Sequence, residues 1–300
     1  MSQNNSRSTV VLAFSVNLLI AIVKFFVWGI TGSSAFFSEG VHSLVDAMNQ
    51  GMLWYGLKKS YGGPNARYPL GRGKEEYFWA LVVAVVFFTL GGVVSIQHGI
   101  EALKYPRVLE KLPVSIFILV VSIILESYVL MRAIKELKHN KKSGKSILSL
   151  LKDSTEGSLI ALIVEDFAAT FGLFIALAGV STAYLTGNSI FDGLSSIFIG
   201  ILLMISGLFL GYEMKHLIVG ESVDNDTKNI IRKSIESNEA VNEVRNLEVV
   251  IIGNKKYLVL GDIDYKDYLN DKSISKANKQ ITQELKDIGS NVVQVFLNTV

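Results

Sequence analysis

Residues 38–46 read SEGVHSLVD, a polar stretch inside a segment that otherwise suits lipid. GSSAFF precedes it and AMNQGMLWYGL follows it, so that Glu39, His42 and Asp46 are surrounded mainly by apolar residues. They are spaced three and then four residues apart, and on a helix positions i, i+3 and i+7 share one face. These side chains, continued by Asn49, therefore line one stripe of a predicted membrane-spanning helix.

A second apolar segment carries a pair of acids. The sequence LIVEDFAATFGL places Glu165 and Asp166 inside residues 162–173. A charged side chain at bilayer depth costs at least about 2.5–3.5 kcal/mol, and it usually faces a bundle interior or an ion pathway. The alternative is a protonated or hydrogen-bonded packing group, which we prefer for isolated polar residues and not for clustered ones. The isolated residues are Asn17, His98 and Glu126.

The clustered residues suit the binding of divalent cations. The chain has no cysteine, so disulfides and thiolate ligands are excluded and a bound metal must use nitrogen and oxygen. Imidazole with carboxylates is a zinc-type ligand set, although it also serves manganese, iron or cobalt. Because the same groups bind protons, protonation expels the metal. A site that binds both metal and protons is what a metal/proton exchanger requires.

The composition is that of a membrane protein. Half of the 300 residues are apolar and 19% are charged, against about 25% charged residues in soluble domains. Six apolar stretches each approach the roughly 20 residues that cross a bilayer. They lie at 8–31, 35–57, 76–102, 113–136, 156–179 and 189–211. We therefore expect residues 1–213 to form an all-α membrane domain of six transmembrane helices in contact with the lipid bilayer.

The charges of the loops predict the orientation. The segments between the second and third stretches and between the fourth and fifth are rich in Lys and Arg, and basic loops stay cytoplasmic. Both termini are then cytoplasmic, as an even number of spans also requires. The first apolar run is too long for a signal peptide and lacks a small-residue cleavage site after it. We expect a retained first span in a multi-pass protein of a prokaryotic plasma membrane.

Residues 214–300 predict a separate cytoplasmic α+β domain. Helix caps and β-rich runs give the order α-β-β-α-β, with an Asp-rich start to the first helix and a Ser cap on the second. This order predicts a ferredoxin-like sheet with both helices on one face, and another α+β type is the alternative. No Gly-rich phosphate loop is present, which disfavours nucleotide hydrolysis. The elements are expected at 224–237, 246–253, 256–265, 273–288 and 291–300.

Three motifs together resemble the cation diffusion facilitator family. SEGVHSLVD matches its acid, His and Asp pattern in span two, and RYPLGRGKEEYFWAL (67–81) resembles its aromatic-Gly-x-Gly-basic-x-Glu signature. FDGLSSIFIGILL (191–203) resembles its Asp-Pro-Ile-Ala-Ser-x-x-Ile-Gly pattern in span six. The resemblance covers nearly the whole chain. VEDFAA (164–169) is most similar to the branch that includes the mitochondrial zinc transporter of animals.

The resemblance implies a homodimer that exports zinc or a related divalent cation from the cytoplasm in exchange for protons. It implies no prosthetic group, no enzymatic activity and no nucleic-acid partner. The family's ligand positions carry His42, Asp46 and Asp166. The usual fourth position, four residues before Asp166, is Leu162 here, and its side chain cannot bind a metal. Glu165, Glu39 or water remains as the fourth ligand, and we favour Glu165.

Two further metal sites of the family are not expected here. Some members bind metal in the loop between spans two and three through His and Asp, and the matching positions here carry neither. The cytoplasmic metal site of the family uses His, and no His follows His216. Asp262 and Asp264 remain as weak oxygen ligands, although alternating acids on a strand usually form its solvated face.

Other classes of function fit the sequence less well. A channel or uniporter could use the same site in the membrane, but a channel needs sites weak enough to release ions quickly. A membrane-anchored scaffold or metal sensor leaves the buried carboxylates unexplained. An intramembrane hydrolase that uses a metal-bound water is also disfavoured.

Overall fold

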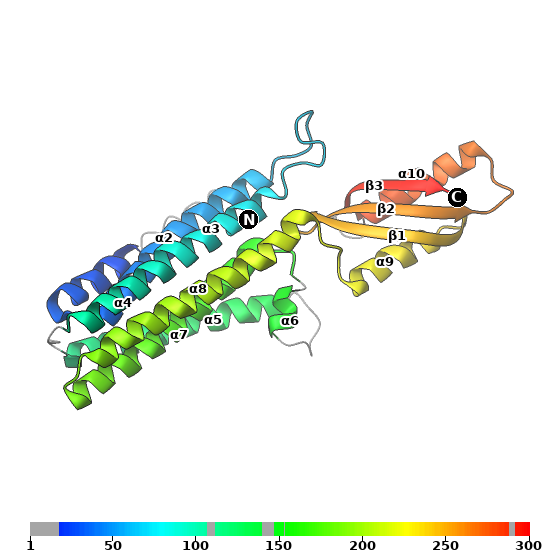
Figure 1. Ribbon diagram of the computed structural model, residues 1–300. Coiled ribbons are helices and arrows are strands. Elements are labelled where there is room, and N and C mark those ends of the chain that lie inside the picture. Colours follow the sequence, from blue (N-terminus) through cyan, green and yellow to red (C-terminus); the bar gives the residue numbers. More distant parts are fainter. Residues whose placement is uncertain (1–17, 107–111, 140–146, 153, 288–291) are drawn as a thin grey trace. The chain divides into compact units, whose positions relative to one another are not determined.

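The computed structural model describes the chain except for residues 1–17, 107–111, 140–146, 153 and 288–291. The chain forms two compact units, whose elements are labelled in Figure 1. The first unit contains Met1–Leu57, Phe78–Lys152 and Gly157–Met214, and the second contains Lys58–Tyr77, Asp153–Glu156 and Lys215–Val300. The second unit thus includes two short segments that the division into 1–213 and 214–300 assigns to the membrane domain.

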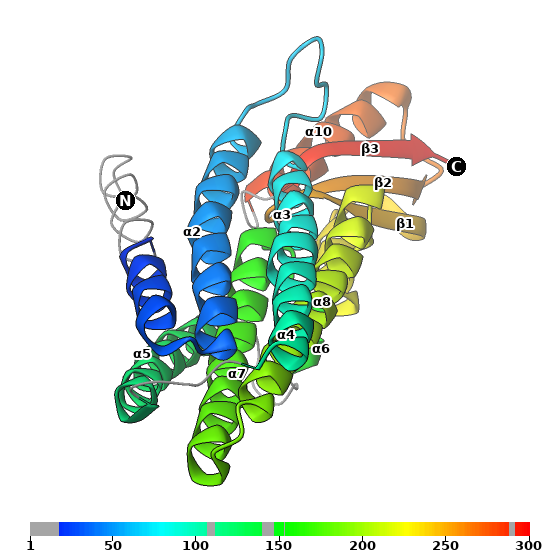
Figure 2. The same cartoon turned by 60° about the vertical axis from the view of Figure 1, so that its left-hand side comes forward.

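The first unit is built from helices, and α2, the α3–α4 run, α7 and α8 lie side by side in it (Figure 2). The helices and the π-helical segment are Leu18–Thr31, α2 (Ser34–Ser60), α3 (Glu75–Val86), the π-helical segment Phe87–Val93, α4 (Val94–Lys104), α5 (Leu112–His139), α6 (Ile147–Lys152), α7 (Gly157–Thr186) and α8 (Ile190–Val219). The π-helical segment joins α3 to α4, so that these three elements form one continuous helical run.

Within the described chain, four helices are long and apolar enough to cross a membrane, and they correspond to the third to sixth predicted stretches. They are Glu75–Lys104, Pro113–Lys135, Gly157–Thr186 and Ile190–Val219. The second predicted stretch is α2, which is long enough but is made less apolar by its polar stripe. The first is described only as the short apolar helix Leu18–Thr31, and residues 8–17 of that prediction lie outside the described chain. The count of six spans stays a prediction.

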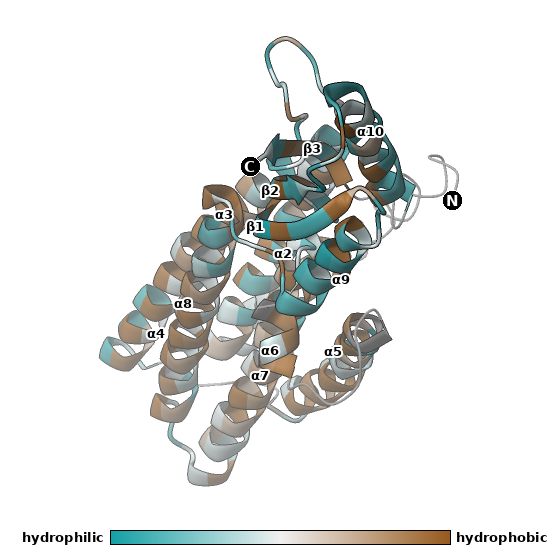
Figure 3. Cartoon of the chain, turned by 90° about the vertical axis from the view of Figure 1, so that its right-hand side faces the viewer, coloured by the Kyte–Doolittle hydropathy of each residue, from teal (hydrophilic) through white to brown (hydrophobic). Residues whose placement is uncertain are grey.

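Hydropathy separates the two units. The helices of the first unit are coloured mainly as hydrophobic, whereas the helices of the second unit carry broad hydrophilic faces (Figure 3). Phe36 and Val45 of α2 are buried in one apolar cluster with Phe87, Leu173 and Leu203. Because α2 supplies both these apolar residues and the buried polar stripe, other helices cover it on more than one side.

Glycines on the α3–α4 run and on α8 let the two backbones touch. Gly92 and Gly99 are seven residues apart, as are Gly193 and Gly200, and we call these four residues the glycine seam. A Cβ atom on Gly200 would lie 2.7 Å from the carbonyl oxygen of Gly92, and one on Gly99 would lie 2.8 Å from that of Gly193. Small residues at a helix interface permit this approach, which drives helix association in membranes.

The second unit has the predicted order of elements. They are α9 (Asn225–Glu236), β1 (Val241–Gly253), β2 (Lys256–Tyr265), α10 (Asp271–Asp287) and β3 (Val292–Thr299). β2 is the central strand, antiparallel to β1 and parallel to β3. α9 packs on β1, α10 packs on β3, and the two helices contact each other, which places both on one face of the sheet.

Of the two helix caps predicted for the second unit, one is confirmed and the other is wrong. Asp224 caps α9 as expected, because its side chain accepts a hydrogen bond from the Thr227 amide at 2.9 Å. α10 is capped by Asn270, whose side chain accepts from the Ser273 amide at 2.9 Å. The Ser cap expected for α10 was therefore wrong, since Asn270 is the residue that satisfies the free N–H groups of its first turn.

The structure of the second unit explains why residues 67–81 contain glycine at positions 71 and 73. Gly71 has a φ of +79°, a conformation that glycine adopts without steric cost. Gly73 lies against the end of β1, where a Cβ atom would be 2.5 Å from the carbonyl oxygen of Ile252. Lys256 at the start of β2 donates to the carbonyl oxygen of Ser60 at 3.1 Å. This basic segment is thus fitted to the β1–β2 hairpin.

The glycine seam predicts that Gly200→Ala lowers the melting temperature of the purified protein in detergent. The added methyl group overpacks the contact at a cost of about 1–3 kcal/mol, which exceeds the gain of up to about 1 kcal/mol from helix propensity. Gly29→Ala is the matched control, because its added Cβ meets nothing within 4 Å, and we expect it to be neutral or stabilising. Equal melting temperatures for the two variants would contradict the close contact.

Candidate metal-transport site

The polar stripe of α2 is buried in the first unit. His42 Nε2 lies 3.4 Å from Asp46 Oδ1, one helical turn away, and the side chain of His42 is only 1% exposed. The imidazole ring packs edge-to-face on Phe87, at 5.3 Å between centroids, so that the first residue of the π-helical segment borders the site. The face predicted from the spacing of the sequence is therefore formed, and it points into the bundle.

α7 brings its own polar residues to this stripe. Asn49 Nδ2 donates to Glu165 Oε1 at 2.5 Å, and Glu165 is near enough to act electrostatically on Asp46. Asp166, the next residue of α7, is near enough to act electrostatically on Asp46. The predicted acids of two separate helices therefore meet, and Asn49 joins them directly.

Several buried polar atoms around this contact have no hydrogen-bond partner among the described residues. They include Asn49 Oδ1 and three potential metal donors, His42 Nε2, Asp46 Oδ1 and Asp166 Oδ2. A buried polar atom without a partner is costly and calls for an explanation such as a missing ion or water. One imidazole nitrogen and two carboxylate oxygens are donors that a divalent cation takes, and protons bind to the same atoms.

The described side chains nevertheless do not form one preassembled coordination shell. Within the part of the chain that the structure describes, no group of three or more His, Asp or Glu side chains is close enough to hold a metal ion together. His42 and Asp46 are adjacent on α2, whereas Asp166 approaches from α7. The assignment of these residues as ligands therefore stays a prediction.

Glu39 occupies the same stripe but already has a partner. Its Oε2 lies 3.0 Å from the Nζ of Lys24, and both side chains are buried. Lys24 also donates to Ser43 Oγ at 2.8 Å. The analysis of the sequence missed Lys24, although a lysine in the apolar run AIVKFFVWG (21–29) is itself an expensive residue that demands a partner.

The surroundings of Glu126 are a further feature that the sequence alone does not show. We expected a packing role for it, and α5 places it near enough to act electrostatically on Asp46, Glu165 and Asp166. A single acid in an apolar helix carries no periodic signal, so only the packing of α5 against α7 reveals its surroundings.

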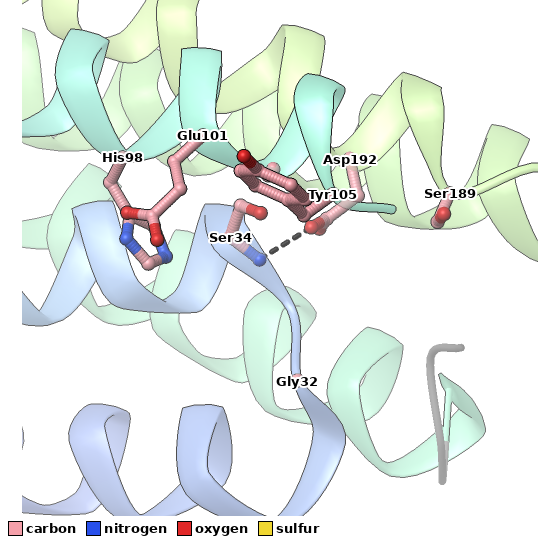
Figure 4. Close-up of a pocket in the computed structure, with 8 residues that line it drawn as sticks. Gly32, Ser34, His98, Glu101, Tyr105, Ser189 and Asp192 are labelled. Carbon is pink, nitrogen blue, oxygen red and sulfur yellow. Dashed lines mark hydrogen bonds between the residues drawn. The ribbon is translucent and has the colours of Figure 1, made fainter. Parts of the chain in front are cut away.

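Asp192 performs a structural task that explains the motif of span six. Its buried carboxylate accepts hydrogen bonds from Ser33 Oγ at 2.5 Å, from the amide of Ser34 and from the amide of Ala35 at 3.4 Å. These amides belong to the first turn of α2, so Asp192 of α8 caps a neighbouring helix (Figure 4). A carboxylate also suits the positive end of the helix dipole. It fixes where α2 begins.

A small cavity lies beside this cap, with a volume of about 30 Å³. His98, Glu101 and Tyr105 line it together with Asp192 (Figure 4). The ring of His98 stacks on Phe37 with centroids 3.8 Å apart. This stacking fits the packing role expected for His98.

Asp262 and Asp264 are engaged by amide and guanidinium groups of the sheet. Asp262 accepts from Asn246 Nδ2 at 3.0 Å and from Asn298 Nδ2 at 3.3 Å. Asp264 lies 3.2 Å from Arg245 Nη2. These partners account for both acids as cross-strand pairs.

The comparison with known families decides what kind of protein carries this arrangement. A family model described as the cation efflux transmembrane domain matches residues 10–218. The chain belongs to the cation efflux family. This family consists of transporters rather than enzymes, and its match together with the apolar helices makes the chain a multi-pass integral membrane protein.

Individual relatives of this cation efflux protein are named for zinc, metals in general and manganese. It is 29% identical over 282 residues to the human mitochondrial proton-coupled zinc antiporter SLC30A9, covering 93% of this chain and 50% of the relative. Metal tolerance protein C4 of Arabidopsis thaliana is 29% identical over 266 residues, covering 88% and 58%. Manganese efflux system protein MneP of Bacillus subtilis is 24% identical over 179 residues, covering 60% and 57%.

These matches confirm the resemblance drawn from the motifs, including the branch indicated by VEDFAA. The cation efflux protein spans about half the length of SLC30A9.

We predict that the double variant Asp262→Asn and Asp264→Asn leaves metal transport by the 300-residue chain unchanged within about twofold, because both acids are bound by sheet residues. Initial rates of zinc uptake into proteoliposomes measure this. Arg245→Gln, which removes one of the partners of Asp264, is the companion variant and should also transport normally. A loss of transport in the double variant with the fold retained would assign these acids a metal-dependent role.

Proposed function

We propose that this protein is a secondary transporter that exports divalent cations from the cytoplasm in exchange for protons, with zinc as the foremost substrate. The observation that carries the proposal is the set of buried, unpartnered atoms His42 Nε2, Asp46 Oδ1 and Asp166 Oδ2. The name of SLC30A9, a proton-coupled zinc antiporter, supports both the substrate and the coupling. The proposal includes six transmembrane spans, cytoplasmic termini, a prokaryotic plasma membrane and a homodimer.

Proton coupling follows from the chemistry of the ligands. Imidazole and carboxylate bind a metal only in their deprotonated forms, so metal binding releases protons and acid weakens metal binding. A neutral cytoplasm therefore favours loading of the site, and a more acidic compartment on the other side favours release. The exchange then requires only one binding site that opens to each side of the membrane in turn.

The proposed ligand set is His42, Asp46 and Asp166, with Glu165 as the fourth ligand. Glu165 is held at the meeting point of α2 and α7 by its hydrogen bond to Asn49, whereas Glu39 is held by Lys24. One imidazole with three carboxylates suits zinc and also manganese. The name of the manganese efflux protein MneP supports manganese as a second substrate.

We predict that Asp46→Asn and Asp166→Asn each weaken zinc binding by more than about 100-fold and abolish zinc-driven proton movement. The loss of a ligand should exceed the 10- to 100-fold effect that is typical for residues that only orient ligands. Counter-flow in proteoliposomes, with and without a pH gradient, measures transport and proton movement together. Asp226→Asn, an exposed acid of α9, controls for the loss of one charge.

The outcomes of this experiment separate the classes of function. Zinc flux that requires no counter-movement of protons would indicate a channel or uniporter instead of an exchanger. Full transport by either variant would remove that residue from the site.

We predict that Glu165→Gln lowers zinc affinity by at least about tenfold while the protein remains folded. The amide has nearly the shape of the carboxylate and keeps an oxygen for Asn49, so the loss of metal-binding charge is isolated from packing. Isothermal titration of the purified protein with zinc gives the affinity. Wild-type affinity in Glu165→Gln would leave Glu39 or water as the fourth ligand.

A further inference from the structure

A lysine is buried in the first described helix of the membrane unit. Lys24 is only 4% exposed, and its Nζ contacts Glu39 Oε2 at 3.0 Å and Ser43 Oγ at 2.8 Å. A charge at this depth is stable only when it is paired, and such residues commonly belong to the functional part of a membrane protein. The proposed function makes no use of Lys24.

Glu39 is confined between two helices. Lys24 holds one carboxylate oxygen, while the other, Oε1, is buried and has no hydrogen-bond partner among the described residues. Oε1 faces Gly172 of α7, where a Cβ atom would lie 2.8 Å away. Glu39 therefore packs closely against α7 at Gly172, while its ion pair with Lys24 holds the other carboxylate oxygen.

This ion pair adjoins the proposed transport site. Glu39 precedes His42 by three residues on the same helical stripe, and Ser43, the other partner of Lys24, follows His42 directly. Asp46 and Glu126 are also near enough to act electrostatically on Lys24. Glu39 is thus one helical turn from the imidazole of His42. Without the ion pair to Lys24, its carboxylate would add an oxygen ligand to the proposed metal site.

We infer that Lys24 is a positioning residue that determines metal specificity, because it holds Glu39 outside the coordination shell. This inference rests on the proposed function. While Lys24 holds Glu39, the metal is bound only by the proposed set of one imidazole and three carboxylates. With Glu39 released, the shell gains a further hard oxygen donor, which favours manganese over zinc. The lysine thus acts through Glu39 and does not touch the metal.

The energetics of buried ion pairs provide a test with matched variants. Removal of one partner leaves an uncompensated buried charge and is strongly destabilising, whereas replacement of both partners by apolar side chains of similar volume is often neutral. Lys24→Met therefore leaves Glu39 without its ion-pair partner. The double variant Lys24→Met with Glu39→Met removes both charged groups. Lys24→Arg keeps the positive charge.

The experiment uses the full-length protein and measures melting temperature in detergent without metal, together with the dissociation constants for zinc and manganese. Lys24→Met should lower the melting temperature and shift the ratio of the two constants toward manganese by about tenfold, equivalent to about 1.4 kcal/mol. The double variant should recover both the melting temperature and the zinc preference. Lys24→Arg should retain the zinc preference.

Each contrary result has its own meaning. An unchanged ratio in Lys24→Met, with normal zinc binding by the wild type, overturns the specificity role and leaves the pair purely structural. Loss of zinc binding by the folded double variant also overturns it, because Glu39 is then itself a ligand. Absence of metal binding in the wild type overturns the proposed function and this inference together.

Discussion

The meeting of the polar faces of α2 and α7 is the interaction on which the rest of the membrane unit depends. Polar side chains inside an apolar bundle are tolerated only when other side chains, protons or ions satisfy them. Asn49 donates to Glu165 at 2.5 Å, while His42, Asp46, Asn49 and Asp166 each keep one buried atom that has no hydrogen-bond partner within the described chain. The same contact therefore holds two helices together and leaves buried donor atoms that the proposed function assigns to the transported ion.

Other elements fix α2 so that this contact can form. Asp192 accepts hydrogen bonds from residues at the start of α2, and Lys24 ties its second turn to the preceding helix through Glu39. Each of these acids is committed to a structural partner, in contrast to Asp46 and Asp166. Position on a helix and membrane depth alone do not distinguish the two kinds of acid. The partners supplied by neighbouring helices do.

Local periodicity explains how much the sequence could predict. The stripe from His42 to Asp46 follows from helical spacing, and the order of elements in the second unit follows from the alternation of amphipathic helices and β-rich runs. Lys24 was missed because a single charge has no period, and its role depends on which helix lies beside it. The cap of α10 was misplaced because Asn270 and Ser273 are both good capping residues and only the hydrogen bond distinguishes them.

The glycine seam has a mechanical consequence. The backbones of the α3–α4 run and α8 touch at Gly92 and Gly200. The two helices therefore cannot slide or rotate past each other without a steric clash, and we expect them to move as one rigid body. Rocking of one bundle against another is the usual way in which transporters expose a site to alternate sides. In a motion of that kind, the α3–α4 run and α8 would belong to the same moving body, because their contact leaves no room for one to shift against the other.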